Sequence, residues 1–111
     1  MNKISNPPKA YSRFVNRFSK LGDAWELMNE AGSAGPLDGR TQRLIKLAVA
    51  MGAMREGNVH SGVRKALADG ISVEELEQCV ALAASTLGMP STVAVFSWIC
   101  DEIDKAETKG L

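Results

Sequence analysis

Apolar residues recur at three- and four-residue steps along most of the chain, a spacing typical of helices with one buried face. The first such series consists of Tyr11, Phe14, Val15, Phe18, Leu21, Trp25 and Met28. It predicts one amphipathic helix that opens near Pro7-Pro8, because proline is tolerated in a first helical turn, and ends near Ala31. The glycine- and proline-containing stretch at residues 32–36 then interrupts the helix and serves as a linker.

The same periodicity predicts four further helices, over about residues 38–52, 54–69, 72–87 and 90–103. Ser72 and Glu75 have the spacing of a capping box, in which each side chain binds the other residue's backbone N–H. Gly70 supplies a C-terminal stop for the helix before them. No segment alternates like a strand, and the short loops favour antiparallel neighbours. We therefore predict an all-α bundle of five to six helices, arranged as antiparallel hairpins.

The length of 111 residues allows one domain. We divide it into an N-terminal amphipathic helix and linker (residues 1–36), a helical core (residues 37–104) and a polar tail that frays (residues 105–111). The apolar faces of the helices predicted over 38–52 and 72–87 are wider than one small domain needs. They predict a homo-oligomer.

The charge balance indicates which partners the chain can bind, and the cysteines indicate the compartment in which it works. Lys+Arg and Asp+Glu are both 13, and this balance argues against nucleic acid and anionic membranes, which select basic surfaces. Cys79 and Cys100 form neither a C-x-x-C nor a zinc-ligand spacing, which fits a reducing compartment. The chain has no apolar run at its N-terminus and no membrane-length apolar stretch. We expect a cytoplasmic protein.

The candidate chemistry centres on His60, the only histidine of the chain. Glu56 lies four residues earlier, so both side chains share one helix face. A carboxylate beside an imidazole favours the charged ring and equips the pair for general acid–base catalysis. Gly57 and Gly62 flank the pair although glycine weakens a helix, which indicates close approach of a ligand or of another helix. A surface ion pair or a satisfied interior histidine would show the same spacing.

The wider segment from Leu37 to Asp101 adds an ordered set of short motifs. In sequence these are L-I-K-L-A-V-A (44–50), Gly52, His60, A-L-A-D-G (66–70), E-E-L (74–76) and G-M-P (88–90). This order resembles the carboxymuconolactone decarboxylase family, which includes the alkylhydroperoxidase-D-like proteins. The resemblance implies an all-α fold that assembles with itself as a dimer, trimer or hexamer, and it gives residues 37–104 the character of that family's core.

The resemblance also limits the chemistry. In the alkylhydroperoxidase-like branch a C-x-x-C precedes the histidine, and its two thiol positions fall here on Ala53 and Glu56. A dithiol peroxidase needs an attacking thiolate and a resolving partner, so peroxidase chemistry of that kind is not expected. The relay glutamate of that branch has no counterpart in Thr41-Gln42-Arg43.

The decarboxylase branch lacks the thiols and carries a glutamate where Glu56 stands. By this resemblance His60 donates a proton, Glu56 orients it, and Arg55 or Arg64 holds the carboxylate of a small substrate. Both arginines are also the kind of residue found on solvated helix surfaces. No cofactor is implied, and a metal site is disfavoured because there is no second histidine.

Two other classes of function are compatible with parts of the pattern. The first is a non-catalytic oligomeric module that binds a ligand or a partner protein. A pocket holding both His60 and Glu56 would favour the enzyme over this module. The second is a helix-turn-helix, suggested by the Ala66-to-Gly70 turn. It is disfavoured because residues 72–87 hold three glutamates and no Lys or Arg, which phosphate would repel.

Overall fold

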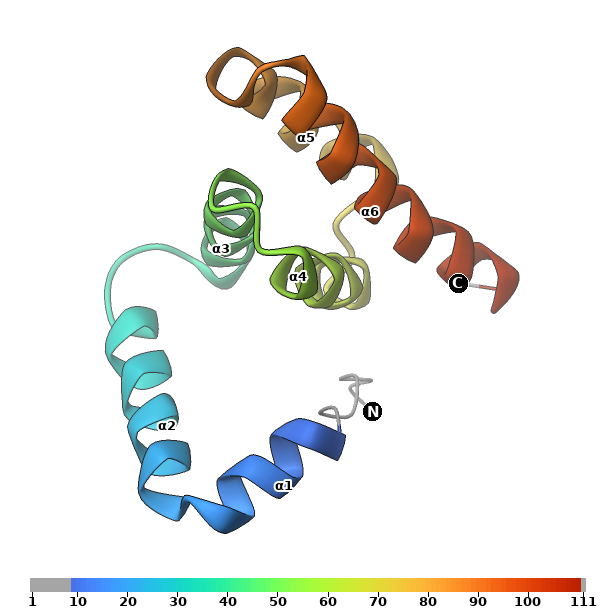
Figure 1. Cartoon of the computed structure of the whole chain (residues 1–111). Coiled ribbons are helices and arrows are strands. Elements are labelled where there is room, and N and C mark those ends of the chain that lie inside the picture. Colours follow the sequence, from blue (N-terminus) through green and yellow to red (C-terminus); the bar gives the residue numbers. More distant parts are fainter. Residues whose placement is uncertain (1–8, 111) are drawn as a thin grey trace.

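The computed structural model describes residues 9–110, and in this range the chain forms six helices. Their bounds are α1 Lys9–Arg17, α2 Ser19–Ser33, α3 Gly39–Gly52, α4 Glu56–Ala68, α5 Val73–Leu87 and α6 Met89–Thr108. Figure 1 shows two parts: α1 and α2 form an N-terminal arm (residues 9–33), and α3 to α6 form a bundle. The predicted all-α class is confirmed. Within residues 9–110, no helix combines the length and apolar composition that crossing a membrane demands.

The core lies entirely within the bundle. Helix α4 packs against α3 on one side and against α6 on the other, while α5 packs against α3 and α6. The buried apolar side chains are Leu47, Ala50, Met51, Val59, Val63, Ala66, Ile71, Leu76, Val80, Val95, Ile99 and Ile103. All of them except Ile71, which lies between α4 and α5, come from the periodic positions of the four bundle helices. The removal of these side chains from water is the main favourable term for folding.

Local capping fixes where two of the bundle helices begin. The backbone N–H of Thr41 donates to the Asp38 carboxylate at 2.7 Å, which caps α3. At α5, the predicted capping box between Ser72 and Glu75 is confirmed in both directions. Arg40 of α3 also contacts both oxygens of Glu75 at 2.6 Å. The Ser72 backbone N–H and the Arg40 guanidinium lower the pKa of Glu75 to about 2.

The single helix predicted from Tyr11 to Ala31 is wrong, because Phe18 leaves the helical conformation and separates α1 from α2. The break turns the chain so that α1 and α2 meet at an angle (Figure 1). Its physical reason is close packing at Gly22, where an added Cβ would lie 3.2 Å from the Cβ of Val15. A continuous helix would hold Val15 and Gly22 two turns apart. The predicted start at Pro7-Pro8 lies outside the described residues.

Two helix ends also differ from the prediction. The helix expected from Met54 begins at Glu56, because Met54 takes the left-handed conformation (φ 56°) and ends α3. The N–H groups of Met54 and Arg55 bind the carbonyls of Met51 and Ala50, the arrangement of a Schellman motif. At the other end of the chain, α6 continues to Thr108, so residues 105–108 are helical where the sequence predicts a frayed tail. Leu111 lies outside the described residues.

The two glycines beside His60 have different surroundings. Gly62 faces α3, and a Cβ placed on it would lie 3.0 Å from Cδ1 of the buried Leu47. Gly57 has nothing within 4 Å of the corresponding position. The close approach of another helix, predicted from the two glycines, is therefore confirmed at Gly62 alone.

This difference yields a matched test on one helix. We expect Gly57→Ala to raise the free energy of unfolding by up to about 1 kcal/mol, since alanine is the better helix former and meets no neighbour. Gly62→Ala gains the same propensity but overpacks Leu47, which costs about 1–3 kcal/mol. Urea unfolding measures both variants, and equal stabilisation by the two substitutions would contradict the close α3–α4 packing.

Candidate functional site

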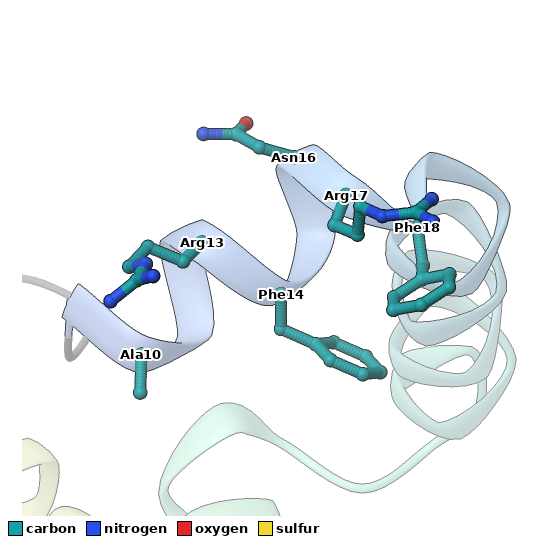
Figure 2. Close-up of a pocket in the computed structure, with 6 residues that line it drawn as sticks. All are labelled: Ala10, Arg13, Phe14, Asn16, Arg17 and Phe18. Carbon is teal, nitrogen blue, oxygen red and sulfur yellow. The ribbon is translucent and has the colours of Figure 1, made fainter.

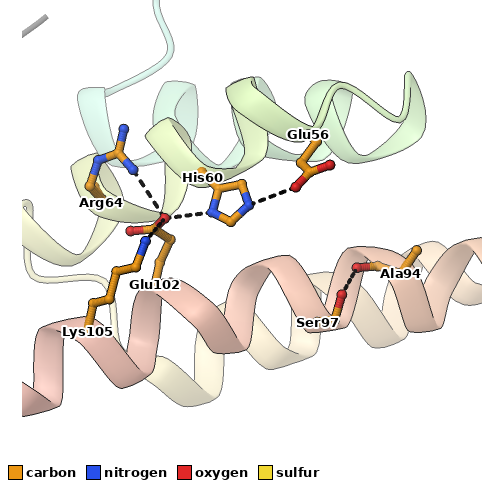
Figure 3. A network of polar contacts seen from close by, with 7 residues as sticks. All are labelled: Glu56, His60, Arg64, Ala94, Ser97, Glu102 and Lys105. Carbon is orange, nitrogen blue, oxygen red and sulfur yellow. Dashed lines mark hydrogen bonds and ion pairs between the residues drawn. The ribbon is translucent and has the colours of Figure 1, made fainter. Parts of the chain in front are cut away.

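His60 lies on the side of α4 that faces α6, and its ring meets a carboxylate there (Figure 3). The Nδ1 atom is 2.6 Å from Oε2 of Glu102, a residue 42 positions later in the chain. The side chain of His60 is 18% exposed, whereas that of Glu102 is only 3% exposed. The contact thus joins a partly accessible ring to a buried carboxylate.

Glu102 is the site residue that the sequence reading missed. It stands on the stripe of α6 that carries Val95, Ile99 and Ile103 into the core. An ionisable residue on a buried stripe is rare unless it is paired, so the position of Glu102 on this stripe indicates a partner on another helix. The residue that completes such a pair cannot be read from α6 alone, because it comes from the facing helix α4.

Two cations complete the surroundings of Glu102. Arg64 Nη1 lies 3.2 Å and Lys105 Nζ 3.6 Å from the same Oε2 atom that contacts His60. Burial by itself raises the pKa of this carboxyl group. The hydrogen bond with His60 and the charges of Arg64 and Lys105 outweigh that effect, so the pKa of Glu102 is lowered overall. At neutral pH Glu102 is therefore an anion that accepts hydrogen bonds.

The second ring nitrogen of His60 points along α4 toward Glu56. Nε2 lies 3.4 Å from Oε2 of Glu56, and the Glu56 side chain is 60% exposed. The two candidate catalytic residues thus lie together, as their four-residue spacing predicts, and their roles stay predictions. A proton on Nδ1 that is donated to Glu102 leaves Nε2 as the atom through which the ring can exchange a proton with its surroundings.

The two candidate substrate-binding arginines differ in position. Arg64 joins the cluster through Glu102 and keeps its side chain 42% exposed. Arg55 lies in the turn before α4 and is exposed. It forms no ion pair with any other residue in the range 9–110. The structure therefore brings Arg64 to His60, and nothing recorded for Arg55 connects it to the cluster.

Neither a prominent hollow nor a group of metal ligands is found at His60 among the described residues. Two hollows stand out on the described part of the chain, one along α1 and one between α2 and α3, and neither is lined by His60. Across residues 9–110 there is also no group of three or more His, Cys, Asp or Glu side chains placed to hold a metal ion. The site is thus an open polar cluster at the edge of the α4–α6 interface.

The thiols of Cys79 and Cys100 lie on α5 and α6, away from the two positions where the dithiol branch has its cysteines. Ala53 follows the end of α3 and Glu56 opens α4. Burial raises the pKa of both thiols, and the Asp104, Glu77 and Asp101 carboxylates raise that of Cys100 further. Both sulfurs therefore stay protonated at neutral pH and are weak nucleophiles.

From these thiols we predict that the protein does not reduce hydroperoxides through cysteine. With dithiothreitol as reductant and an alkyl hydroperoxide as substrate, peroxide consumption should equal the rate without protein. Peroxide loss that disappears in Cys79→Ala or Cys100→Ala would contradict this.

The lowered pKa of Glu102 predicts a pH-dependent stability. Because the unfolded value is about 4.3, ionised Glu102 stabilises the fold above that pH, and this part is lost as the pH falls through the lower folded value. Glu102→Gln should cost about 1–2 kcal/mol at pH 7, and the difference from the unsubstituted protein should shrink toward pH 3. Urea unfolding from pH 3 to 7 measures it.

The matched control is Glu107→Gln, an exposed glutamate on the same helix, which should leave the stability profile unchanged. Other carboxylates of lowered pKa, such as Asp38 and Glu75, remain in every variant and cancel in the comparison. A constant difference between the Glu102→Gln and unsubstituted profiles across this range would contradict an ionised Glu102.

The model of the carboxymuconolactone decarboxylase family matches residues 19–100. The match runs from the first residue of α2 into α6 and includes Glu56, His60 and Arg64, whereas Glu102 and Lys105 lie just beyond it. No curated protein and no solved structure matches the chain. Because the match covers well over half of the sequence, the chain belongs to the carboxymuconolactone decarboxylase family.

Proposed function

We propose that this protein is a thiol-independent acid–base enzyme, of decarboxylase or lyase type, that transfers a proton at His60 to a small carboxylated substrate. The observation that carries the proposal is the 2.6 Å contact between His60 Nδ1 and the buried Glu102 carboxylate. An imidazole whose far nitrogen is held by a buried carboxylate has a fixed tautomer and orientation. These are the properties required of a general acid or base.

In this proposal Glu102 is a positioning residue and His60 the catalytic one. Glu102 accepts the Nδ1 proton, so the proton that moves is the one on Nε2. Glu56 lies on the Nε2 side, and its exposed carboxylate can exchange protons between the ring and water. Because Glu56 is exposed and its Oε2 lies 3.4 Å from Nε2, its side chain can rotate away when a substrate approaches Nε2.

The reaction balances without an oxidant or a thiol. When the bond between a substrate carbon and its carboxylate breaks, carbon dioxide leaves and the electron pair stays on the carbon as an enolate. His60 Nε2–H then delivers the proton to that carbon, and the ring regains a proton from water through Glu56. Arg64 is half-exposed and uses Nη1 for Glu102, so its remaining N–H groups are free to hold a developing oxyanion or a substrate carboxylate.

One observation favours the non-catalytic module as a second candidate. Neither of the two prominent hollows is lined by His60 or Glu56. In that case the His60–Glu102 contact would serve to satisfy a polar pair between α4 and α6, and a ligand or partner protein would bind elsewhere on the bundle.

The test of the enzymatic proposal starts with carboxymuconolactone, the compound that gives the family its name, and measures carbon dioxide release. We expect His60→Ala to fold and to lose at least about a hundredfold in kcat, the usual contribution of a general acid. Glu102→Ala should lower kcat with little change in KM, and Glu102→Gln should recover part of the loss, because its amide oxygen can still accept from Nδ1. Glu107→Gln, on the exposed face of α6, is the control.

A second readout does not depend on turnover. Because the chain has one histidine, nitrogen NMR of the ring gives a single, unambiguous pair of signals. Neutral His60 should carry its proton on Nδ1, and small carboxylates such as the substrate should shift the Nε2 signal. No turnover together with an Nε2 signal that ignores these carboxylates would contradict the enzyme and leave the binding module.

A further inference from the structure

The hollow between α2 and α3 is lined by polar and charged side chains. Its volume of about 680 Å³ lies within the range of sites for small molecules. The wall on α3 carries three cations, which are Arg40, Arg43 and Lys46. The wall on α2 contributes the amide of Asn29 and the hydroxyl of Ser33. The hollow is thus a polar space between the arm and the bundle.

The linker at one end of this hollow is held by hydrogen bonds (Figure 1). The side-chain amide of Gln42, on α3, donates to the backbone carbonyl of Leu37 at 2.7 Å and to that of Ser33 at 3.3 Å. These bonds join the end of α2 to α3, although α2 contains no buried residue of its own. A ligand that contacts both walls of the hollow would therefore fasten the arm more firmly to the bundle.

The cations on this side of the bundle lie close enough to repel one another. Burial lowers the pKa of Lys65, on α4, and the positive charges of Arg43, Lys46 and Arg64 lower it further. Within residues 9–110, neither Lys46 nor Lys65 forms an ion pair. The described part of the chain therefore leaves these two positive charges without a direct counterion, and an anion bound beside them would relieve the repulsion.

The two arginines of the hollow keep hydrogen-bond donors in reserve. The side chain of Arg43 is 22% exposed, and its buried Nε atom has no hydrogen-bond partner within residues 9–110. Oδ2 of Asp69 lies 3.7 Å from this atom, beyond hydrogen-bond distance. Arg40 binds Glu75 through Nη2 alone. Both guanidinium groups can therefore donate to a further acceptor.

We propose that the hollow between α2 and α3 is a second ligand site, which binds a small molecule through a phosphate group. A phosphate group carries about two negative charges at pH 7 and several acceptor oxygens, so it can meet Lys46 and the Arg43 guanidinium together. A single carboxylate carries half that charge. Glu30 and Asp69 also line the hollow and oppose an anion, so the doubly charged group is favoured. The site is independent of proton transfer at His60.

The hollow along α1 is different in character. Figure 2 shows Arg13 pointing away from Phe14, while the Arg17 guanidinium lies over the ring of Phe18, 4.8 Å from its centre. Arg17 is thus engaged in a cation–π contact, and the two arginines do not converge on one point. Arg13 therefore provides a matched control for Arg43, because it is an arginine of the same chain outside the proposed site.

Titration of the full chain with inorganic phosphate at constant ionic strength, followed by proton–nitrogen NMR, tests the proposal. We expect saturable shifts of the amide signals of residues 29–46. Arg43→Gln and Lys46→Gln should each weaken phosphate binding about tenfold, because each removes a charge-assisted hydrogen bond. Glu30→Gln should strengthen binding about threefold, because it removes a repelling carboxylate. Arg13→Gln makes the same change as Arg43→Gln outside the hollow and should bind phosphate normally.

The ring of His60 provides an internal check, because Arg64 and Lys105 form a separate pair of cations near it. Phosphate in the hollow should leave the Nε2 signal of His60 unchanged. Shifts confined to the surroundings of His60 overturn the proposal, as does a titration without saturable shifts or a Kd that Arg43→Gln and Lys46→Gln leave unchanged. Circular dichroism checks that each variant keeps its helices, and Lys46 is exposed, so its substitution tests the site even where Arg43→Gln unfolds the chain.

Discussion

Glu102 places a negative charge in the interface between α4 and α6, and the arrangement of the site follows from how that charge is satisfied. A lone buried carboxylate would cost several kcal/mol, so the two helices are stable in this register only with partners supplied to Oε2. His60 and Arg64 come from α4, and Lys105 comes from the next turn of α6. The same contacts hold the imidazole ring in one orientation. The contact that satisfies the buried charge of Glu102 is therefore the same contact that orients the ring of His60.

Helix α4 brings these groups together because it packs closely on both sides. Gly62 lets it approach Leu47 of α3, and Val59 and Val63 seal it within the core. The left-handed turn at Met54 ends α3 and sets the entry of α4, so Glu56 stands at its first turn. The polar groups of α4 thus lie beside a rigid apolar stripe, where their orientation is set by packing rather than by a flexible loop.

The arm and the bundle relate to each other differently from the helices within the bundle. The four bundle helices bury a common core, whereas α1 and α2 contain no buried residue and meet one another at Val15 and Gly22. The charged residues are also distributed unevenly, since the arm begins with basic residues and residues 66–104 contain no Lys or Arg.

The sequence by itself determined the features that depend on neighbours three or four residues away. Apolar periodicity gave the bundle helices, Ser72 and Glu75 gave a cap, and the Glu56–His60 pair followed from helix geometry. Tertiary structure decided what depends on distant segments. Glu102 meets His60 because of the way α4 and α6 pack, and the helix breaks at Phe18 because Val15 packs on Gly22. The spacing of residues along the chain determines which side chains share one face of a helix. Which residues of two different helices meet is decided by how these helices pack to bury their apolar stripes.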